Sequence, residues 1–457
     1  MVEIRISNDF YFPLHFQKED PSMAQVNEGL KREVGVWGIS ANIVNIIVGA
    51  GIFVLPAIVA ETMGASGVIA YLFCGFLIAL VMLCFAEAGS KVTHSGGGYA
   101  YVETAFGPYP GFLASIFMMM GSIFSDAAVS NALVEILALA FPIFKNQTVR
   151  LIFLFLIFSG LAMVNVIGVK QGIGLVKINT IAKLTPLLFL IVIGWKDASM
   201  ANLYWESTPT LQQFGEASLI LFFAFQGGDA GLTIGGEIKN PQKTVPRAIF
   251  IGISSVLFLY IMIQAVSQGV LGAELPNFKE APLAETAKIV FGPVGYTLLF
   301  IGAGISMFGM LSGEILNNPR VIFAMARDGV IPFGKLASIH HRFKTPHLAI
   351  FLYAGLGFTL AAIGGFRQLA IIASASMLLV YFGVSLSVIK LRQMKETRPE
   401  EFKIPLGYTV PLLSAGIILY FLSNLSGVEI QGTLILIGVL TMIYFLMRFF
   451  RKGKIRF

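Results

Sequence analysis

Apolar runs of about twenty residues recur from one end of this chain to the other, separated by short polar stretches. At about 1.5 Å of rise per residue, a helix of that length spans the roughly 30 Å hydrocarbon core of a bilayer. The pattern therefore predicts an all-α integral membrane protein with about twelve transmembrane helices. The expected spans are 34–60, 67–90, 111–141, 151–167, 176–195, 217–238, 248–271, 295–325, 348–365, 369–389, 408–425 and 430–450.

Charged residues are scarce and unevenly placed. They make up 12% of the chain, about half of the ~25% usual in soluble proteins. With both termini in the cytoplasm, the inner segments hold about 25 Lys and Arg and the outer loops about six, as the positive-inside rule requires. We therefore expect a multi-pass protein of the cytoplasmic membrane with cytoplasmic termini. Since the net charge of +7 lies in these loops, lipid is the expected surrounding and nucleic acid is not an expected partner.

Small residues interrupt the first expected span at its centre. The stretch is Gly49-Ala50-Gly51, and Pro56 lies just beyond it. Closely spaced glycines lack the side chains that restrict the backbone, so a helix could unwind at this point. A packing face of small residues between two helices is the alternative explanation.

A second interruption favours unwinding. The sixth span carries Gln226, the paired glycines Gly227 and Gly228, and the carboxylate Asp229 at mid-membrane depth. Because the first and sixth spans are five helices apart, the pattern predicts a 5+5 inverted repeat in which helices 1 and 6 are broken. The expected organisation is a tail without a cleavable signal at 1–33, repeats at 34–195 and 214–390, helices 11 and 12 at 404–450, and a tail at 451–457.

A broken helix exposes backbone groups that can bind a charged solute. The amides at a half-helix N-terminus, with its partial positive charge, suit a carboxylate, and the carbonyls at the other end suit an ammonium group. An amino acid carries both groups. We therefore expect a secondary active transporter, a permease for amino acids that works by alternating access.

Several short motifs follow one another along the chain in a fixed order. They are Gly-Ala-Gly-Ile-Phe at 49–53, Ser-Gly-Gly with two following tyrosines at 95–101, Phe-x-Gly-x-Asp at 225–229, Glu-Ile-Lys-Asn-Pro at 237–241, Val-Pro-Arg-Ala at 245–248 and Ala-Arg-Asp-Gly-x-x-Pro at 326–332. From residue 34 onward, the chain thereby resembles permeases of the amino acid–polyamine–organocation (APC) superfamily, which have the leucine-transporter type of fold.

The resemblance implies a backbone site for the substrate carboxylate at the first break. The amides of Ala50 and Gly51 would hold the carboxylate, within the stretch that begins at Gly49. Relatives often have serine where this chain has Ala50. The missing hydroxyl removes a hydrogen bond worth about 0.5–1.5 kcal/mol, but the backbone site should remain.

The resemblance also implies which groups face the ammonium and the rest of the substrate. The carbonyls of Ile47, Phe223 and Gln226 would hold the ammonium group. The rings of Phe223 and Phe225 would gate or line the pocket. Gly227 and Gly228 would have a structural or gating role at the second break.

Lys183 lies inside the fifth expected span, where an unpaired ammonium costs at least ~2.5–3.5 kcal/mol. Many sodium-independent members of the family resemble this chain in having a lysine there, in the place of the coupling sodium. We therefore expect sodium-independent transport in which Lys183 bridges the first and eighth helices. Protons are a candidate co-substrate through this lysine. A fixed structural cation, or one that snorkels to the inner face, is the alternative.

Three carboxylates lie deep in apolar sequence: Asp126 in the third span, Asp229 in the sixth and Glu314 in the eighth. Intramembrane acids are functional candidates by default. Asp229 matches a family position that usually holds an acid, and it could be a structural partner of the break or a substrate ligand. Asp126 and Glu314 could receive a cation on the substrate side chain, or form protonated hydrogen bonds between helices.

Two further acids match family positions near the inner ends of helices. Glu87 and Glu237 are expected to pair with loop cations and to belong to the inner gate. The five histidines are His15, His94, His340, His341 and His347, and none has metal-ligand spacing in an apolar segment. No metal or other cofactor is therefore expected.

Other classes of membrane protein fit the sequence less well. A channel needs a continuous pore, and an enzyme needs a nucleophile with a base or a metal cluster. The sequence shows neither signal. A polyamine or other amine carrier, and an amino acid sensor that does not transport, stay open as alternatives. The identity of the substrate, the mode of coupling and the oligomeric state are not determined by these patterns.

Overall fold

A computed structural model describes residues 35–92, 97–168, 173–205, 208–229, 241–327, 329–331, 333–394 and 401–453. Every regular element in these ranges is helical, so the all-α prediction is confirmed. The α-helices are α1 (Val36–Ile47), α2 (Gly51–Met63), α3 (Val68–Lys91), α4 (Gly98–Phe106), α5 (Pro108–Ala140), α6 (Gln147–Ile167), α7 (Ile173–Gly194), α8 (Leu211–Leu221), α9 (Pro241–Leu271), α10 (Pro282–Asn317), α11 (Pro319–Arg327), α12 (His347–Ile363), α13 (Phe366–Met394), α14 (Thr409–Ser423) and α15 (Gly427–Gly453). Short 3-10 helices are η1 (Gly64–Gly67), η2 (Pro142–Lys145), η3 (Met200–Leu203), η4 (Phe222–Phe225), η7 (Gly272–Asn277) and η8 (Gly334–Ala337).

Seven helical stretches in the described ranges are long and apolar enough to cross a membrane, and five shorter apolar helices accompany them. The chain is therefore a multi-pass membrane protein, as the apolar runs predict. Two of the shorter helices, α1 and the stretch Leu211–Phe225, end directly at the glycines that interrupt the first and sixth expected spans.

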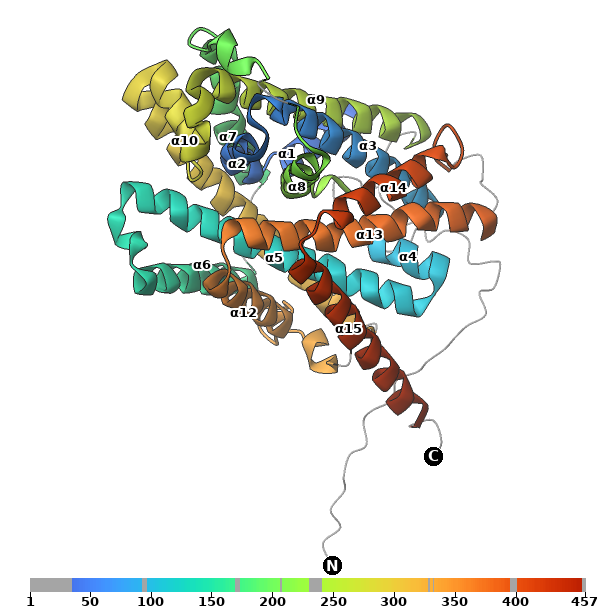
Figure 1. The fold of residues 1–457 in the computed structure, drawn as a ribbon. Coiled ribbons are helices and arrows are strands. Elements are labelled where there is room, and N and C mark those ends of the chain that lie inside the picture. Colours follow the sequence, from blue (N-terminus) through green and yellow to red (C-terminus); the bar gives the residue numbers. More distant parts are fainter. Residues whose placement is uncertain are drawn as a thin grey trace, which may run out of the picture.

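The core joins helices that are far apart in the sequence. α13 packs along α5, α1 packs against α9, and α7 packs against α10 (Figure 1). One large cluster of buried apolar side chains runs through these helices together with α2, α3 and η4. The C-terminal α15 diverges from this body, and side chains such as Leu434 and Ile435 are exposed on it. Apolar exposure of this kind suits contact with lipid.

Two features of α10 and its neighbours differ from the spans expected from the sequence. Gly292 has a φ of 71° and a ψ of −162°, so α10 bends there, and Pro293 follows with no amide hydrogen to donate. The part of α10 before Gly292 is a helical extension that precedes the expected span at 295–325. The short helices α4 and α11 were not expected as separate elements.

Candidate functional site

The first helix is interrupted at the predicted place. α1 ends at Ile47, Val48 has a ψ of 82°, and α2 begins at Gly51. The amide of Gly49 folds back on the carbonyl of Ile47 at 2.8 Å, which closes a tight turn. The backbone therefore leaves the helical path for a few residues only, and α2 presents its first amides at the break.

The second interruption lies beside the first. After η4, Gln226 adopts an extended conformation with a ψ of 162°, and Gly227 has a φ of 88°, which strongly favours glycine. Close packing also requires glycine at the first break, since a Cβ on Gly51 would lie 2.8 Å from the Cβ of Ala224. The two unwound segments are therefore in direct contact.

A buried tyrosine on α9 joins the two interrupted segments. The hydroxyl oxygen of Tyr260 lies 2.9 Å from the carbonyl oxygen of Ile47 and 2.9 Å from that of Ala224. Tyr260 is fully buried. Because a hydroxyl has a single proton, it donates to one of these carbonyls at a time. Nothing in the sequence motifs marked this residue, but a tyrosine in an apolar span usually needs a partner for its hydroxyl, which is a usable signal.

A cavity of about 100 Å³ opens where the two breaks meet. One side of it is formed by the unwound segments, and the other by α5, α10 and α13. The lining residues are Ile46, Ile47, Gly49, Ala50, Gly51, Gly121, Ser122, Ser125, Phe223, Ala224, Gln226, Gly227, Met310, Glu314 and Met377.

The cavity contains most of the residues expected at a substrate site. Seven of them line it: Ile47, Gly49, Ala50, Gly51, Phe223, Gln226 and Glu314. Gly227, which was expected to serve the structure of the second break, lines it as well. The sequence reasoning missed Ser122, Ser125, Met310 and Met377. The two serines are three residues apart and so share one face of α5, which is a pattern that could have been recognised.

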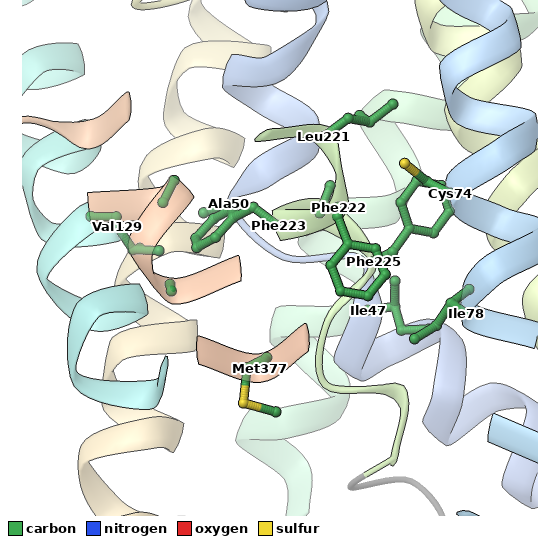
Figure 2. Close-up of a cluster of buried hydrophobic side chains, with 14 of the residues drawn as sticks. Ile47, Ala50, Cys74, Ile78, Val129, Leu221, Phe222, Phe223, Phe225 and Met377 are labelled. Atoms are coloured by element: carbon green, nitrogen blue, oxygen red, sulfur yellow. The ribbon is translucent and has the colours of Figure 1, made fainter. Parts of the chain in front are cut away.

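The two phenylalanines of the second break point in different directions. Phe223 lines the cavity beside Ala50 (Figure 2). Its ring packs edge-on against that of Phe366, with ring centroids 5.8 Å apart. Phe225 is turned towards Cys74 and Ile78 and is fully buried. It does not line the cavity, so Phe223 alone of the pair lies where a ring could gate or line the pocket.

The carbonyl of Ile47, which the resemblance assigns to the substrate ammonium, already has partners. It accepts hydrogen bonds from the amide of Gly49 and the hydroxyl of Tyr260. A carbonyl oxygen has two lone pairs. An ammonium group that binds here must therefore displace the tyrosine hydroxyl, which can turn to Ala224.

The second break is held on α13. The side-chain amide of Gln226 donates to the hydroxyl of Ser374 at 2.8 Å. The hydroxyl of Tyr381 donates to the carboxylate of Asp229 at 2.7 Å. Asp229 and Gly228 do not line the cavity. Asp229 therefore lies where it anchors the break, and not where it meets a solute in the cavity.

Asp126 and Glu314 belong to one hydrogen-bonded chain on three helices. The hydroxyl of Tyr353 on α12 donates to Asp126 on α5 at 2.7 Å. The amide of Asn318 donates to Tyr353 at 3.0 Å and also to Glu314 on α10. Glu314 reaches the cavity, whereas Asp126 is fully buried and outside it. The structure thus separates two acids that the sequence treated alike.

Lys183 is buried on α7, 6% exposed, and its ammonium donates to the backbone carbonyl of Asn45 at 2.7 Å. This bond joins α7 to α1 just before the first break. α7 also packs along α10. Among the described residues, the hydrogen bond of Lys183 goes to the first helix, and no bond from it to α10 is found.

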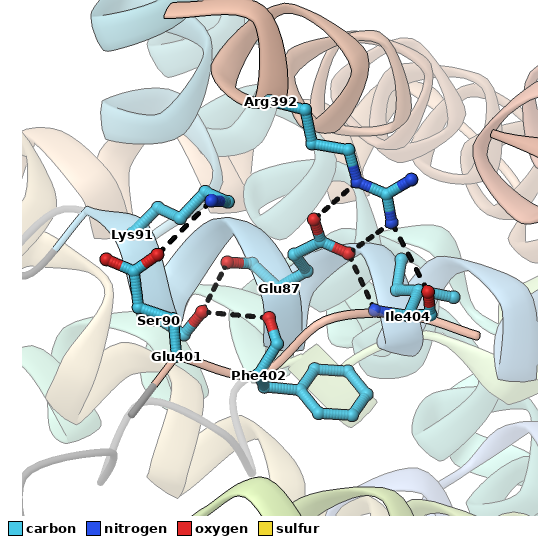
Figure 3. A network of polar contacts seen from close by, with 7 residues as sticks. All are labelled: Glu87, Ser90, Lys91, Arg392, Glu401, Phe402 and Ile404. Carbon is cyan, nitrogen blue, oxygen red and sulfur yellow. Dashed lines mark hydrogen bonds and ion pairs between the residues drawn. The ribbon is translucent and has the colours of Figure 1, made fainter. Parts of the chain in front are cut away.

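Glu87, near the end of α3, lies in a dense polar network (Figure 3). Its two carboxylate oxygens accept bonds of 2.6 Å from Arg392 on α13, and the amide of Ile404 donates to it at 2.8 Å. Lys91 pairs with Glu401 at 3.2 Å close by. The network ties the end of α3 to α13 and to the segment 401–404. Glu237, the second acid expected at this gate, lies outside the described residues.

Known proteins resemble this chain along nearly its whole length. The family profile described as "Amino acid permease" matches residues 34–447. The serine/threonine exchanger SteT of Bacillus subtilis (strain 168) is 30% identical over 399 residues, which cover 85% of this chain and 90% of that protein. In the same organism, a methylthioribose transporter is 28% identical, covering 94% and 96%, and the branched-chain amino acid permease BcaP is 26% identical, covering 92% and 93%.

The relatives are membrane transporters and not enzymes, and this chain is of the same class. Its apolar helices, two of them interrupted around a small cavity, are the arrangement that such transporters use. The chain belongs to the amino acid permease family of the amino acid–polyamine–organocation superfamily, as its motifs predict.

Proposed function

We propose that this permease is a sodium-independent secondary transporter of small neutral amino acids in the cytoplasmic membrane. It works by alternating access, with both termini in the cytoplasm. The observation that supports the proposal best is the cavity formed where the two unwound segments touch. Half-helix ends that meet at one point offer donors and acceptors to the two charged groups of an amino acid at the same time.

The substrate carboxylate binds the free amides at the start of α2, at Ala50 and Gly51. α2 is 13 residues long, so its macrodipole adds attraction for an anion. The ammonium group binds carbonyls of Ile47, Phe223 and Gln226. When it reaches Ile47, the hydroxyl of Tyr260 turns to the carbonyl of Ala224, since both oxygens lie 2.9 Å from it.

A small neutral side chain suits the opposite wall. The wall carries two hydroxyls, Ser122 and Ser125, and two thioethers, Met310 and Met377. A cavity of about 100 Å³ favours a short side chain. The serine/threonine exchanger SteT, at 30% identity, supports substrates of this size.

Lys183 stands in for sodium by giving a fixed positive charge beside the first break. Its bond to the carbonyl of Asn45 supports this role, because a metal ion in that place would use backbone carbonyls as ligands. Transport then needs no sodium gradient.

The proposed architecture is twelve membrane helices with two five-helix repeats of inverted orientation at 34–195 and 214–390, and helices 11 and 12 at 404–450. The two interruptions at α1/α2 and after η4 support it, since each would open one repeat. The polyamine alternative needs several acids in the cavity, but Asp126 and Asp229 lie outside its lining. A sensor would bind the same ligands without flux.

Thermal stabilisation of the purified chain by a panel of amino acids and amines tests the substrate class. A ligand at 100 times its Kd adds about 2.7 kcal/mol of stability. We expect serine, threonine or alanine to stabilise the protein in sodium-free buffer, and putrescine to have no effect. Stabilisation by amines without a carboxylate, and by no amino acid, would overturn the proposal.

A further inference from the structure

Among the described residues that line the cavity, Glu314 is the one with an ionisable side chain. It lies on α10, opposite the two breaks, and its side chain is partly exposed to the cavity. The amide of Asn318 bonds to Oε2 of Glu314. This bond holds the carboxylate in place and leaves Oε1 as the oxygen that can take another partner.

A second acid lies behind Glu314. The chain from Glu314 runs through Asn318 and Tyr353 to Asp126. Asp126 is fully buried, and its Oδ1 has no hydrogen-bond partner among the described residues. Two like charges at the two ends of one short buried chain disfavour each other, so the pair resists being ionised together.

No cation compensates these acids in the described part of the chain. No ion pair joins Asp126 or Glu314 to a lysine, arginine or histidine there. α2 and α6, which pack against α10, carry their only ionisable side chains, Glu61 and Arg150, near an end of the helix. The other ionisable groups on elements around α10 are Tyr109, Asp126 and Glu135 on α5, Lys177 and Lys183 on α7, Lys243, Arg247 and Tyr260 on α9, Arg320 and Arg327 on α11, His347 and Tyr353 on α12, and Asp229 after η4.

Two of those groups, Lys183 and Tyr260, already have hydrogen-bond partners beside the breaks. The ammonium of Lys183 donates to the carbonyl of Asn45, and the hydroxyl of Tyr260 donates to the breaks. An uncompensated carboxylate inside a membrane is costly. A neutral amino acid brings no net charge of its own, so the charge of Glu314 must be neutralised by something else while the cavity is occupied.

We propose that Glu314 carries a coupled proton and makes the permease a proton symporter. Oε1 takes up a proton from the outer solution when the neutral amino acid binds. The same O–H bond breaks after the amino acid has left to the cytoplasm, and the proton goes to the inner solution. One proton and one amino acid thus move inwards in each cycle. The inference rests on the proposed transport of neutral amino acids.

Asp126 holds a different position in this scheme. The side-chain amide of Asn318 separates Tyr353 from Glu314, and an amide does not readily pass a proton along. Asp126 and Tyr353 therefore fix the position of Asn318, and Glu314 exchanges its proton through the cavity. Lys183 does not line the cavity, so Glu314 is better placed than the lysine to respond to an incoming solute.

Uptake into proteoliposomes that hold the purified full-length chain tests the inference in two modes. Labelled serine, or whichever amino acid stabilises the protein best, is followed once under an inward proton gradient and once as counterflow at equal pH. For the wild type, we expect the gradient to raise uptake several-fold and a protonophore to remove the increase. For Glu314→Gln, uptake under the gradient is compared with the counterflow of the same variant, and we expect the stimulation by the gradient to vanish.

A matched control is Glu285→Gln. Glu285 is on the same helix but pairs with the exposed Lys288 at 3.1 Å, away from the cavity. This variant should keep the stimulation. The inference is wrong if Glu314→Gln keeps it too, or if the wild type shows counterflow without any response to the gradient. The second result would leave the proposed amino acid transport intact, whereas absence of all uptake and binding by the wild type would overturn that proposal instead.

A second experiment measures proton uptake when the substrate binds, and it applies even if the Glu314→Gln variant does not transport. In weakly buffered detergent solution with a pH indicator, the wild type should take up protons when serine is added. The Gln variant should bind serine and take up none. If the variant does not fold, the affinity of the wild type for serine is measured at several pH values instead. Binding that is linked to uptake of one proton weakens by up to about tenfold for each unit by which the pH rises. An affinity independent of pH, or equal proton uptake by both proteins, would contradict the inference.

Discussion

The hydroxyl oxygen of Tyr260 lies 2.9 Å from the carbonyl oxygen of Ile47, the last residue of α1 before the first break. The same oxygen lies equally far from the carbonyl of Ala224 in η4, just before the second break. One side chain on α9 therefore bridges the two segments that enclose the cavity. In the proposed site, an ammonium group bound at Ile47 would compete with this hydroxyl, which would then turn to Ala224.

Removal of this hydroxyl should affect both stability and transport. Tyr260→Phe leaves buried carbonyls without their donor, which costs about 1–3 kcal/mol of stability. We expect a lower melting temperature and a reduced kcat, because the two breaks are no longer held together. Tyr204→Phe is the control, since Tyr204 is 76% exposed. A Tyr260→Phe protein with wild-type melting and kinetics would show that the bridge is unimportant.

The close contact of the two breaks gives a second prediction. Gly51→Ala places a methyl group 2.8 Å from the Cβ of Ala224. Overpacking of this kind costs about 1–3 kcal/mol and should push the segments apart. We expect substrate affinity, measured by thermal stabilisation or isothermal titration, to fall about tenfold or more, a change of about 1.4 kcal/mol or more. Gly160→Ala is the matched control, because nothing lies within 4 Å of a Cβ at that position. Equal affinities in the two variants would contradict the proposed site.

Lys183 offers a test of sodium independence. The wild type should take up substrate equally in sodium and in choline buffer. Lys183→Ala removes the charge next to the first break, and we expect uptake to fall by at least about tenfold, the effect of 1.4 kcal/mol. Lys196→Ala, at an exposed position after α7, should leave uptake unchanged. Undiminished transport by Lys183→Ala would show that the lysine has no role in transport. Sodium-dependent uptake by the wild type would contradict the proposal that transport is independent of sodium.

The polar network at the end of α3 predicts a large difference between two ion pairs. The side chains of Glu87 and Arg392 are 0% and 6% exposed, so Glu87→Gln leaves a buried guanidinium unpaired. Such a loss costs about 3–5 kcal/mol. The exposed pair of Lys288 and Glu285 should contribute no more than about 1 kcal/mol. Denaturation of the purified variants in mild detergent measures both, and similar shifts for the two would contradict the structural assignment of the Glu87 network.

The sequence predicts those parts of the fold that local chemistry determines. Apolar runs predict the membrane helices, and the glycines around Ala50 and at Gly227 predict the two interruptions, because glycines weaken a helix and a φ of 88° strongly favours glycine. The site residues of the unwound backbone were predicted from the resemblance to the permease family. Most of them line the cavity.

Features that depend on the rotation of a helix could not be predicted in this way. Phe223 and Phe225 are two residues apart in a 3-10 turn, and only the three-dimensional packing turns one to the cavity and the other to α3. Likewise, Asp126 and Glu314 are both acids in apolar sequence. Only the packing of the helices shows that Asp126, which accepts a hydrogen bond from Tyr353, is the one that is fully buried. These outcomes depend on contacts between helices that are distant in the sequence.

Counterflow in sodium-free proteoliposomes tests the central claim most directly, that the cavity between the two breaks carries amino acids across the membrane. Vesicles with the purified chain are loaded with unlabelled serine, and labelled serine is added outside at trace concentration. The account predicts transient accumulation of label by the wild type and by Gly160→Ala, and little or none by Gly51→Ala. Failure of the wild type to accumulate any amino acid of a broad panel, or equal accumulation by Gly51→Ala, would contradict it.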